Sequence, residues 1–142
     1  MVSVRKSVVI SAPPDRVFEY VTEPSTMAEW LTKMVEVRDI VGTGEGQQYE
    51  WTYKYAGLLL RGQSVVVQHV PNRLAVSQSI GMIGSTWTFR VEPHEEGSTL
   101  TIEVEYSVPI PVLGKIAEHV AVRLDARDLE TSLSNVQDML AS

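Results

Sequence analysis

The sequence contains no cysteine, which removes disulfides, thiolate zinc sites and cysteine nucleophiles from consideration. Its histidines, His69, His94 and His119, have no short metal-ligand spacing. Neither an HExxH motif nor a Gly-x-Ser-x-Gly elbow is present. We therefore expect no metal site and no cofactor, and the sequence offers no familiar catalytic motif.

Long hydrophobic runs are also absent. No apolar stretch approaches the roughly 20 residues that cross a bilayer. The N-terminus goes straight into alternating residues, without the apolar stretch and cleavage site of a signal peptide. We expect no membrane span and, by default, a cytoplasmic location. The net charge of -6, with no cluster of Lys or Arg, would repel a phosphate backbone, so nucleic acid is a poor partner.

The chain has the size and composition of one globular domain. Its 142 residues are enough to bury a substantial core, and we expect a single domain over residues 1–142 without a linker. Apolar residues make up 44% and charged residues 21%, close to the globular average. Disorder is therefore not indicated.

The first third of the chain predicts a strand followed by two short helices. Residues 2–10 are rich in valine, with Val2, Val4, Val8 and Ile10 in one register, as in a strand with one buried face. Pro13 and Pro14 end the strand and suit the first turn of a helix. Thr26 and Glu29 have the spacing of a capping box, which predicts the start of a second helix. The two helices would carry Val17, Phe18, Val21, Trp30 and Leu31.

Residues 34–108 change to a period of two, broken by turn signals at Gly42 to Gly46, Ala56-Gly57, Pro71-Asn72, Gly81 to Gly84 and Glu95 to Gly97. This spacing predicts six strands in an antiparallel sheet. Residues 112–140 contain no proline and one glycine, so we expect a long helix with one face along the sheet. Its apolar stripes comprise Leu113, Ala117, Val120 and Leu124, then Leu129, Leu133, Val136 and Leu140.

A family resemblance rests on this order of elements, the stretch from Ile10 to Phe18, the downstream Trp30, the turn Gly97-Ser98-Thr99 and the closing helix. With these features the sequence resembles the START/Bet v 1 (SRPBCC) superfamily, in particular its polyketide cyclase/dehydrase-like branch. The resemblance covers essentially the whole chain. It implies the α+β helix-grip fold, in which a curved seven-stranded antiparallel sheet wraps around a long C-terminal helix. Two short helices would lie between the first two strands, and an internal cavity would hold hydrophobic ligands.

The stretch from Tyr49 to Tyr55 is the most informative for a binding site. Strict alternation places Tyr49, Trp51, Tyr53 and Tyr55 on one face of a strand. Phenols left unpaired when buried cost about 1 to 3 kcal/mol each, which argues for a cavity where the hydroxyls meet water or a ligand. The alternative is an ordinary core with the hydroxyls bound to backbone carbonyls at the sheet edge; we favour the cavity lining.

Two further aromatics, Trp87 and Tyr106, should lie on the same inner surface, and each has a polar tip that a pocket can use. Trp30 has two interpretations, and we favour structural packing over ligand contact. Arg61 and Gln78 lie in strands where alternation aims them either inward or outward. If inward, they would orient a ligand, and Arg61 would bind a carboxylate or phenolate; a solvent-facing arginine is the favoured alternative.

In the final helix, Val120 and Leu124 complete the expected ligand-contacting set. Asp128 falls four residues after Leu124, on the stripe that faces the sheet, which would bring it to the cavity. The alternative is that the stripe drifts, as the series from Leu129 onward indicates, and we favour it because aspartate is almost never fully buried unpaired. The drift predicts a solvated patch of Asp125, Arg127 and Asp128.

Three functions are consistent with these features. The favoured hypothesis is a non-catalytic binder or carrier of a hydrophobic or aromatic small molecule. The second is an enzyme resembling the polyketide aromatase/cyclases, in which Tyr53, Arg61 and Gln78 would assist enolisation and dehydration if all three faced the cavity. The third is a protein-interaction module, for which the sequence pattern shows no exposed apolar patch. Ligand identity, catalysis and the choice between monomer and homodimer stay open.

Overall fold

The computed structural model describes residues 2–55, 57–81, 84–106 and 114–141, with Tyr55 and residues 114–124 described by their backbone alone. Within these residues the chain forms seven strands, three α-helices and one 3₁₀ turn. The strands are β1 (Val2–Ile10), β2 (Met34–Val41), β3 (Gln48–Tyr55), β4 (Leu58–Val70), β5 (Leu74–Gly81), β6 (Ser85–His94) and β7 (Gly97–Tyr106). The helices are α1 (Pro14–Thr22), α2 (Met27–Trp30) and α3 (Gly114–Leu140), and η1 (Pro24–Thr26) is the 3₁₀ turn.

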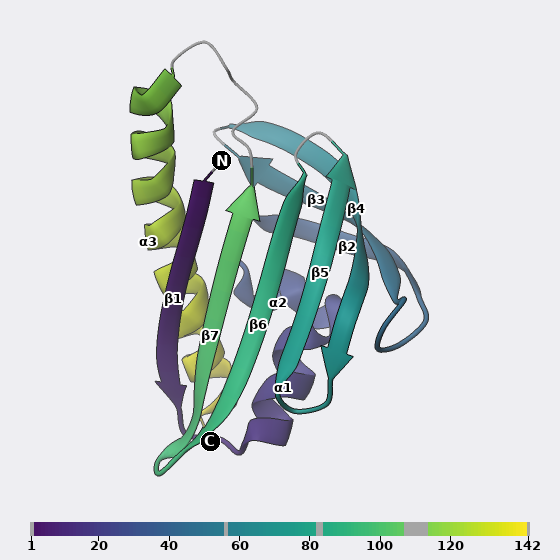
Figure 1. The fold of residues 1–142 in the computed structure, drawn as a ribbon, viewed down its shortest axis with the longest axis vertical. Coiled ribbons are helices and arrows are strands. Elements are labelled where there is room, and N and C mark those ends of the chain that lie inside the picture. The colour runs from purple at the N-terminus through teal and green to yellow at the C-terminus, as the bar shows by residue number, and fades with distance from the viewer. Residues whose placement is uncertain (1, 56, 82–83, 107–113, 142) are drawn as a thin grey trace.

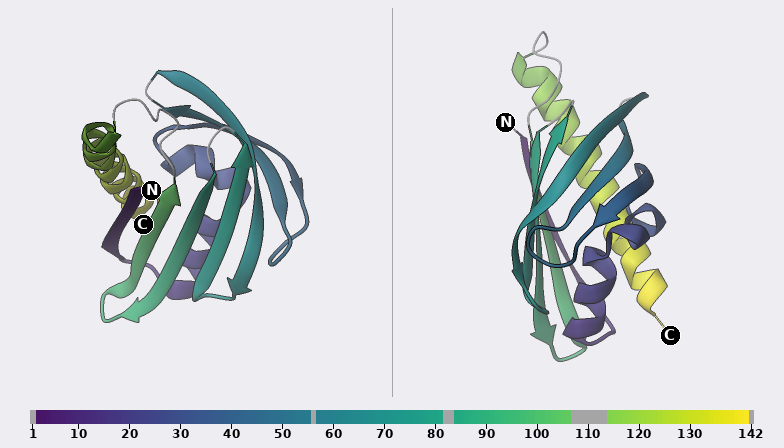
Figure 2. Two further views of the ribbon diagram at one scale, coloured as in Figure 1. Left: turned by 45° about the horizontal axis from the view of Figure 1, so that its top comes forward. Right: turned by 90° about the vertical axis from the view of Figure 1, so that its right-hand side faces the viewer.

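All seven strands form one antiparallel sheet in the order β1-β7-β6-β5-β4-β3-β2. β1 and β2 are therefore the two edges, and the segment with α1 and α2 carries the chain from one edge to the other (Figure 1). The sheet is strongly bent, and all three helices lie on its inner side (Figure 2). The architecture confirms the predicted helix-grip fold, with α3 packed chiefly on β1.

The start of α1 follows from its prolines. Pro13 is the N-cap and Pro14 the first helical residue, where a missing amide hydrogen costs nothing. The predicted capping box at Thr26 is wrong. Thr26 itself has helical φ and ψ at the end of η1, and its hydroxyl donates to the carbonyls of Tyr20 and Glu23 instead of accepting from an amide.

The second half of α3 is fixed to the rest of the fold. The apolar series Leu129, Leu133, Val136 and Leu140 is buried, as its spacing predicts. Polar side chains add anchors, because Asn135 Nδ2 donates to the Trp30 carbonyl at 3.1 Å and Gln137 Nε2 to the Val9 carbonyl at 2.8 Å. The earlier series lies outside the described side chains; it comprises Leu113, Ala117, Val120 and Leu124.

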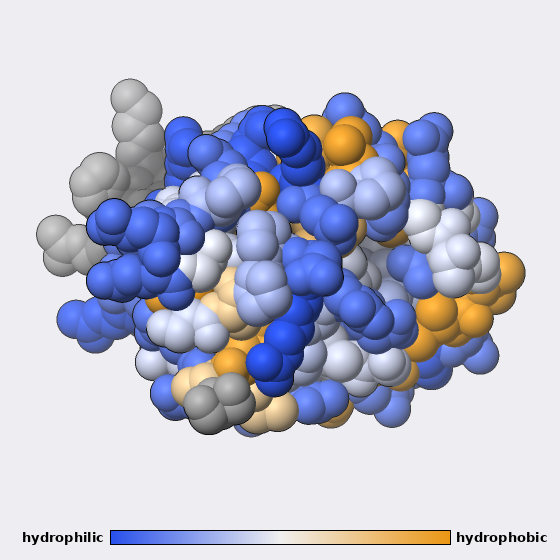
Figure 3. Space-filling model, turned by 90° about the horizontal axis from the view of Figure 1, so that it is seen from below, coloured by the Kyte–Doolittle hydropathy of each residue, from blue (hydrophilic) through white to orange (hydrophobic). Residues whose placement is uncertain are grey.

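Trp30 is fully buried and packs edge-on against Phe89, with ring centroids 6.2 Å apart. Structural packing, the favoured interpretation, is therefore confirmed. Its indole nitrogen has no hydrogen-bond partner among the described residues. Seen from below, the molecule presents a mainly hydrophilic surface with smaller hydrophobic areas (Figure 3).

No helix within the described ranges has both the length and the apolar character needed to span a membrane. The structure does expose several large apolar side chains that the sequence pattern did not reveal as a group. They include Leu58, Leu59 and Ile80, each more than half exposed.

Candidate ligand-binding site

A pocket of about 110 Å³ lies between the inner face of the sheet and the second half of α3. We call it the inner pocket. Every strand contributes to its lining, together with α2 and α3, so most of the fold is needed to shape it. Its lining residues are Val4, Met27, Leu31, Met34, Tyr49, Trp51, Tyr53, Leu60, Ser64, Ser77, Ser79, Ser85, Trp87, Phe89, Val104, Tyr106, Asp125, Asp128, Leu129 and Ser132.

Strand β3 supplies one aromatic wall. Tyr49, Trp51 and Tyr53 all line the inner pocket, with Tyr49 and Trp51 buried and Tyr53 half-buried. Alternation along the strand explains this arrangement, since every second side chain faces the same way. The fourth predicted member of the row, Tyr55, has its side chain outside the described atoms.

The polar tips of this wall meet serine hydroxyls. The Trp51 indole nitrogen donates to Ser64 Oγ at 2.9 Å, and the hydroxyls of Ser64 and Ser77 are close enough to the Tyr49 phenol to lower its pKa. Burial raises the pKa of Tyr49 above its usual 10.0, and the two serine hydroxyls lower it by less. The polar groups that lower this pKa thus lie on β4 and β5, and backbone carbonyls at the sheet edge are not among them.

The strand register places further serines in one row across the sheet. Tyr49 pairs with Ser64, Ser64 with Ser79, Ser79 with Ser85, and Ser85 with Tyr106. We call Ser64, Ser79 and Ser85 the serine row. Their small side chains leave space beneath α3, and the hydroxyls of Ser79 and Ser85 hydrogen-bond to each other. Sequence reasoning missed this row, because its members fall on three strands and only the register aligns them.

The two aromatics predicted from β6 and β7 also line the inner pocket, Trp87 half-buried and Tyr106 buried. Trp87 stacks at a tilt against Phe89, with centroids 6.2 Å apart. The predicted contacts Val120 and Leu124 lie on α3, but their side chains are outside the described atoms.

Arg61 and Gln78 do not line the pocket. Arg61 pairs across the sheet with Thr52, and Gln78 lies between the inward Ser77 and Ser79, so alternation turns both to the outer face. Both side chains are exposed. The expectation that they point inward to orient a ligand is therefore corrected, and the solvent-facing alternative for Arg61 holds.

The favoured prediction for α3 is also corrected. Asp125 and Asp128 both line the inner pocket and are partly buried, whereas Arg127 is exposed. The drift of the apolar stripe is real, because Leu129 and Leu133 are buried, but it turns the helix by too little to move Asp128 into solvent. Two carboxylates one helical turn apart therefore face a pocket that is otherwise mainly apolar and aromatic.

A second, wider pocket of about 430 Å³ adjoins the first, between α1 and the strands β4 and β5. We call it the side pocket. It shares Met27, Tyr49, Ser77 and Phe89 with the inner pocket, so these side chains form the wall between the two. The charged residues in its lining are Asp15, Glu19 and Glu23 from α1 and its C-terminal end. His69 lies in the same pocket, edge-on to Phe18 with ring centroids 5.3 Å apart.

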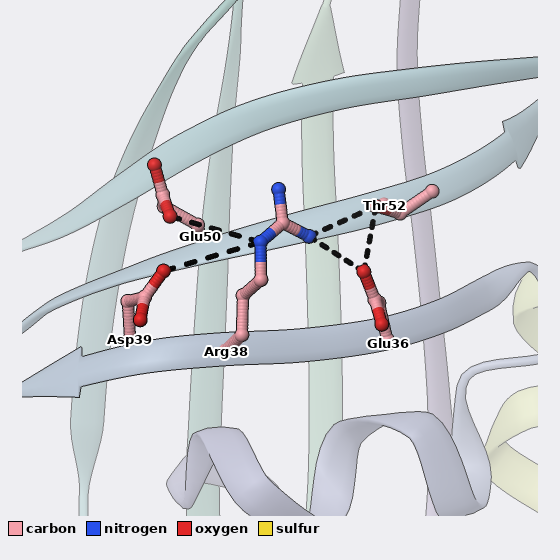
Figure 4. Close-up of polar contacts among 5 residues, drawn as sticks. All are labelled: Glu36, Arg38, Asp39, Glu50 and Thr52. Atoms are coloured by element: carbon pink, nitrogen blue, oxygen red, sulfur yellow. Dashed lines mark hydrogen bonds and ion pairs between the residues drawn. The ribbon is translucent and has the colours of Figure 1, made fainter.

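A different polar cluster lies on the outer face of β2 and β3 (Figure 4). Arg38 is surrounded by three carboxylates: Glu36 Oε1 at 2.7 Å, Glu50 Oε2 at 3.7 Å and Asp39 Oδ2 at 4.0 Å. A hydrogen bond to Asp39 raises the pKa of Glu50, assisted by desolvation and by the Asp39 charge and opposed by Arg38. We call this group the Arg38 cluster. It links the two strands beside the irregular register at Arg38 and Val41.

In the part of the chain that the structure describes, no three His, Asp or Glu side chains are grouped as metal ligands. The polar groups in the described lining of the inner pocket are serine and tyrosine hydroxyls, the indole nitrogens of Trp51 and Trp87 and the two aspartates.

The curved sheet, the two short helices and the long closing helix define the START/Bet v 1 class of helix-grip proteins. A model of the family described as polyketide cyclase/dehydrase and lipid transport matches residues 1–141. The chain belongs to this family. No curated protein sequence matches it significantly.

Solved structures with the same fold are distant in sequence. TTHA0849 from Thermus thermophilus aligns with a TM-score of 0.84 at 18% identity, covering 97% of this chain and 96% of that one. A START superfamily protein from Mycobacterium smegmatis gives 0.80 at 15% identity, covering 97% and 96%. The di-domain ARO/CYC StfQ of the steffimycin biosynthetic pathway gives 0.78 at 16% identity, and the match covers 98% of this chain and 50% of StfQ. At these identities the likeness concerns the fold.

Proposed function

We propose that the chain binds a small aromatic or amphipathic molecule in the inner pocket. The observation that carries this proposal is the lining itself, in which aromatic rings from β3, β6 and β7 surround a row of serine hydroxyls. Ligand sites are typically apolar and aromatic with a few placed polar groups, and this pocket has that composition.

The size of the pocket restricts the ligand. A cavity of about 150 Å³ accommodates one benzene ring, and the inner pocket at about 110 Å³ is of that order. One ring with short substituents therefore suits the inner pocket. Longer ligands would have to extend past Tyr49 and Phe89 into the side pocket.

Intrinsic fluorescence provides the test, because Trp51 and Trp87 line the inner pocket. We expect indole, 1-naphthol and 2-phenylethanol to change the emission in a saturable way. Ser79→Phe places a ring inside the pocket and should abolish the response. Gln78→Phe places the same ring on the outer face of the same strand and should leave it intact.

Circular dichroism establishes that both variants fold, and Ser85→Leu replaces Ser79→Phe if the latter does not. Saturable binding that survives a filled pocket would contradict the proposal. So would the absence of any saturable response with the native chain.

A cyclase/dehydrase-type reaction in the same pocket is the second candidate, favoured by the family and by Asp128. A carboxylate beside several hydroxyls can accept and return a proton during enolisation and loss of water. Arg61 and Gln78 take no part in this candidate reaction, because both side chains lie on the outer face of the sheet. Incubation with a poly-β-keto thioester long enough for intramolecular aldol addition and loss of water, followed by chromatography of the mixtures from native chain and Asp128→Asn, tests this candidate: a cyclised product from the native chain alone supports it.

A further inference from the structure

The charged lining of both pockets is acidic. Asp125 and Asp128 face the inner pocket, and Asp15, Glu19 and Glu23 line the side pocket that adjoins it. Among the described lining residues of the two pockets there is no Lys or Arg. A carboxylate ligand would therefore meet charges of its own sign in both pockets, which disfavours its binding.

The walls of the inner pocket add to this preference. The faces of Tyr and Trp rings carry negative potential and attract cations within about 6 Å of their centres. Tyr53, Trp87 and Tyr106 line the same pocket as Asp128. A protonated amine is the chemical group that both features favour, since the carboxylate supplies a charge-assisted hydrogen bond and the rings a favourable surface.

Two hydrogen bonds of Ser132, one within α3 and one to Thr32, hold the segment that carries Asp128. Ser132 Oγ donates to the Asp128 carbonyl at 2.8 Å and accepts the Thr32 amide at 3.2 Å. Ser132 itself is buried, and Leu129 packs in the core one residue beyond Asp128. The Asp128 backbone is thus fixed over the pocket, and the residue as a whole is partly buried in its lining.

We infer that the ligand is an arylalkylamine, an aromatic ring on a short chain that ends in a protonated amine, with the amine directed at Asp128 and the ring among the aromatic walls. This inference rests on the proposed function, because it names the chemical class that the inner pocket would take. The acidic side pocket would concentrate such cations near the inner pocket, an effect that salt weakens.

Three compounds that share a phenyl ring and a two-carbon chain separate charge from shape. They are 2-phenylethylamine, 2-phenylethanol and 3-phenylpropionate, which are cationic, neutral and anionic at pH 7. Calorimetric titration of the native chain should give the tightest binding for the amine and the weakest for the carboxylate. The amine's affinity should fall as salt is raised, whereas that of the alcohol should change little.

Asp128→Asn keeps the shape of the side chain and removes its charge. We expect it to weaken binding of the amine about tenfold, equivalent to about 1.4 kcal/mol, and to change the affinity for the alcohol much less. Asp138→Asn, at an exposed position of the same helix, is the matched control and should change neither. Circular dichroism checks that each variant is folded.

The outcomes separate this inference from the proposed function. If the alcohol binds in the inner pocket but the amine binds no tighter, or if Asp128→Asn leaves the amine's affinity unchanged, the inference fails and the proposed function stands. If none of the three compounds binds to the native chain and none of the fluorescence ligands changes the emission, both the inference and the proposed function fail. Preference for the carboxylate would overturn the inference directly.

Discussion

The polar groups on the two faces of β3 lie in opposite environments, exposed on the outer face and buried on the inner one. On the outer face, Glu50 joins the Arg38 cluster, where an arginine lies among three carboxylates and water reaches all four charged side chains. On the inner face, Tyr49 and Trp51 direct their polar tips to neutral serine hydroxyls in a buried setting. The outer groups would lose little if unpaired, because water replaces the partner, whereas the inner ones would lose much.

The difference indicates where the function lies. An exposed ion-pair cluster is a common surface feature and adds little to stability. A buried hydroxyl network under a pocket needs matched partners on three strands, and it shapes a space that only a ligand or water can fill.

Gly62→Ala should destabilise the protein by about 3 kcal/mol, the upper end of the usual cost of overpacking. Gly62 lies opposite Trp51, and a Cβ there would come within 2.6 Å of Trp51 Cη2 and 2.7 Å of the Ile80 carbonyl oxygen. The Trp51 ring would have to leave the pocket wall. Chemical denaturation measures the effect. The control is Gly84→Ala, whose Cβ would meet only the Ser79 carbonyl oxygen, at 3.8 Å. Equal stability of the two variants would contradict the packing described here.

Ser64→Ala should cost about 2 kcal/mol, because it removes the acceptor of the Trp51 indole and a hydroxyl close to the Tyr49 phenol. The matched control is Gln63→Ala on the outer face of β4, where the exposed amide bonds to Gln48 at 3.1 Å. A change of less than about 0.5 kcal/mol is expected there. Urea unfolding curves of both variants give the comparison, and a larger loss at Gln63 would reverse it.

The aromatics of β3 and their serine partners also show what the sequence could and could not predict. Period two and the turn residues predict the strands, and the aromatics of β3 follow from alternation alone. The partners of those aromatics do not, since Ser64, Ser77 and Ser79 look like ordinary strand positions until the register aligns them. The prediction that Asp128 faces solvent is wrong for a related reason. Whether a helix position faces a pocket depends on how the helix is rotated about its axis, and the drifting apolar stripe does not fix that rotation over the turn that contains Asp128.

Alkaline pH should destabilise the folded protein in part through Tyr49. Burial raises the pKa of Tyr49 in the folded protein. As pH rises above about 10, the Tyr49 phenol therefore loses its proton in the unfolded chain before it does so in the folded protein. Stability is then unaffected below the unfolded pKa and falls as pH rises from there toward the folded pKa. Thermal unfolding between pH 8 and 11 should show a shallower decline in Tyr49→Phe than in the native chain. An identical slope would mean that the Tyr49 phenol is not desolvated.

Arg38→Gln should have the smallest effect, within about 0–1 kcal/mol of the native stability, even though it removes the centre of a cluster with three carboxylates. The same change should raise the pKa of Glu50 further, because the Arg38 charge now lowers it. Denaturation and carboxyl NMR titration measure the two quantities. A stability loss as large as that of Ser64→Ala would remove the contrast between the faces.

NMR contacts between a bound ligand and the protein methyl groups show whether a small aromatic molecule lies between the sheet and α3. With 2-phenylethanol or 2-phenylethylamine at saturation, the ring protons should show nuclear Overhauser effects to the methyls of Leu60, Val104 and Leu129, which line the inner pocket. Contacts confined to the exposed methyls of Leu58, Leu59 and Ile80 would place the ligand on the surface and contradict the account.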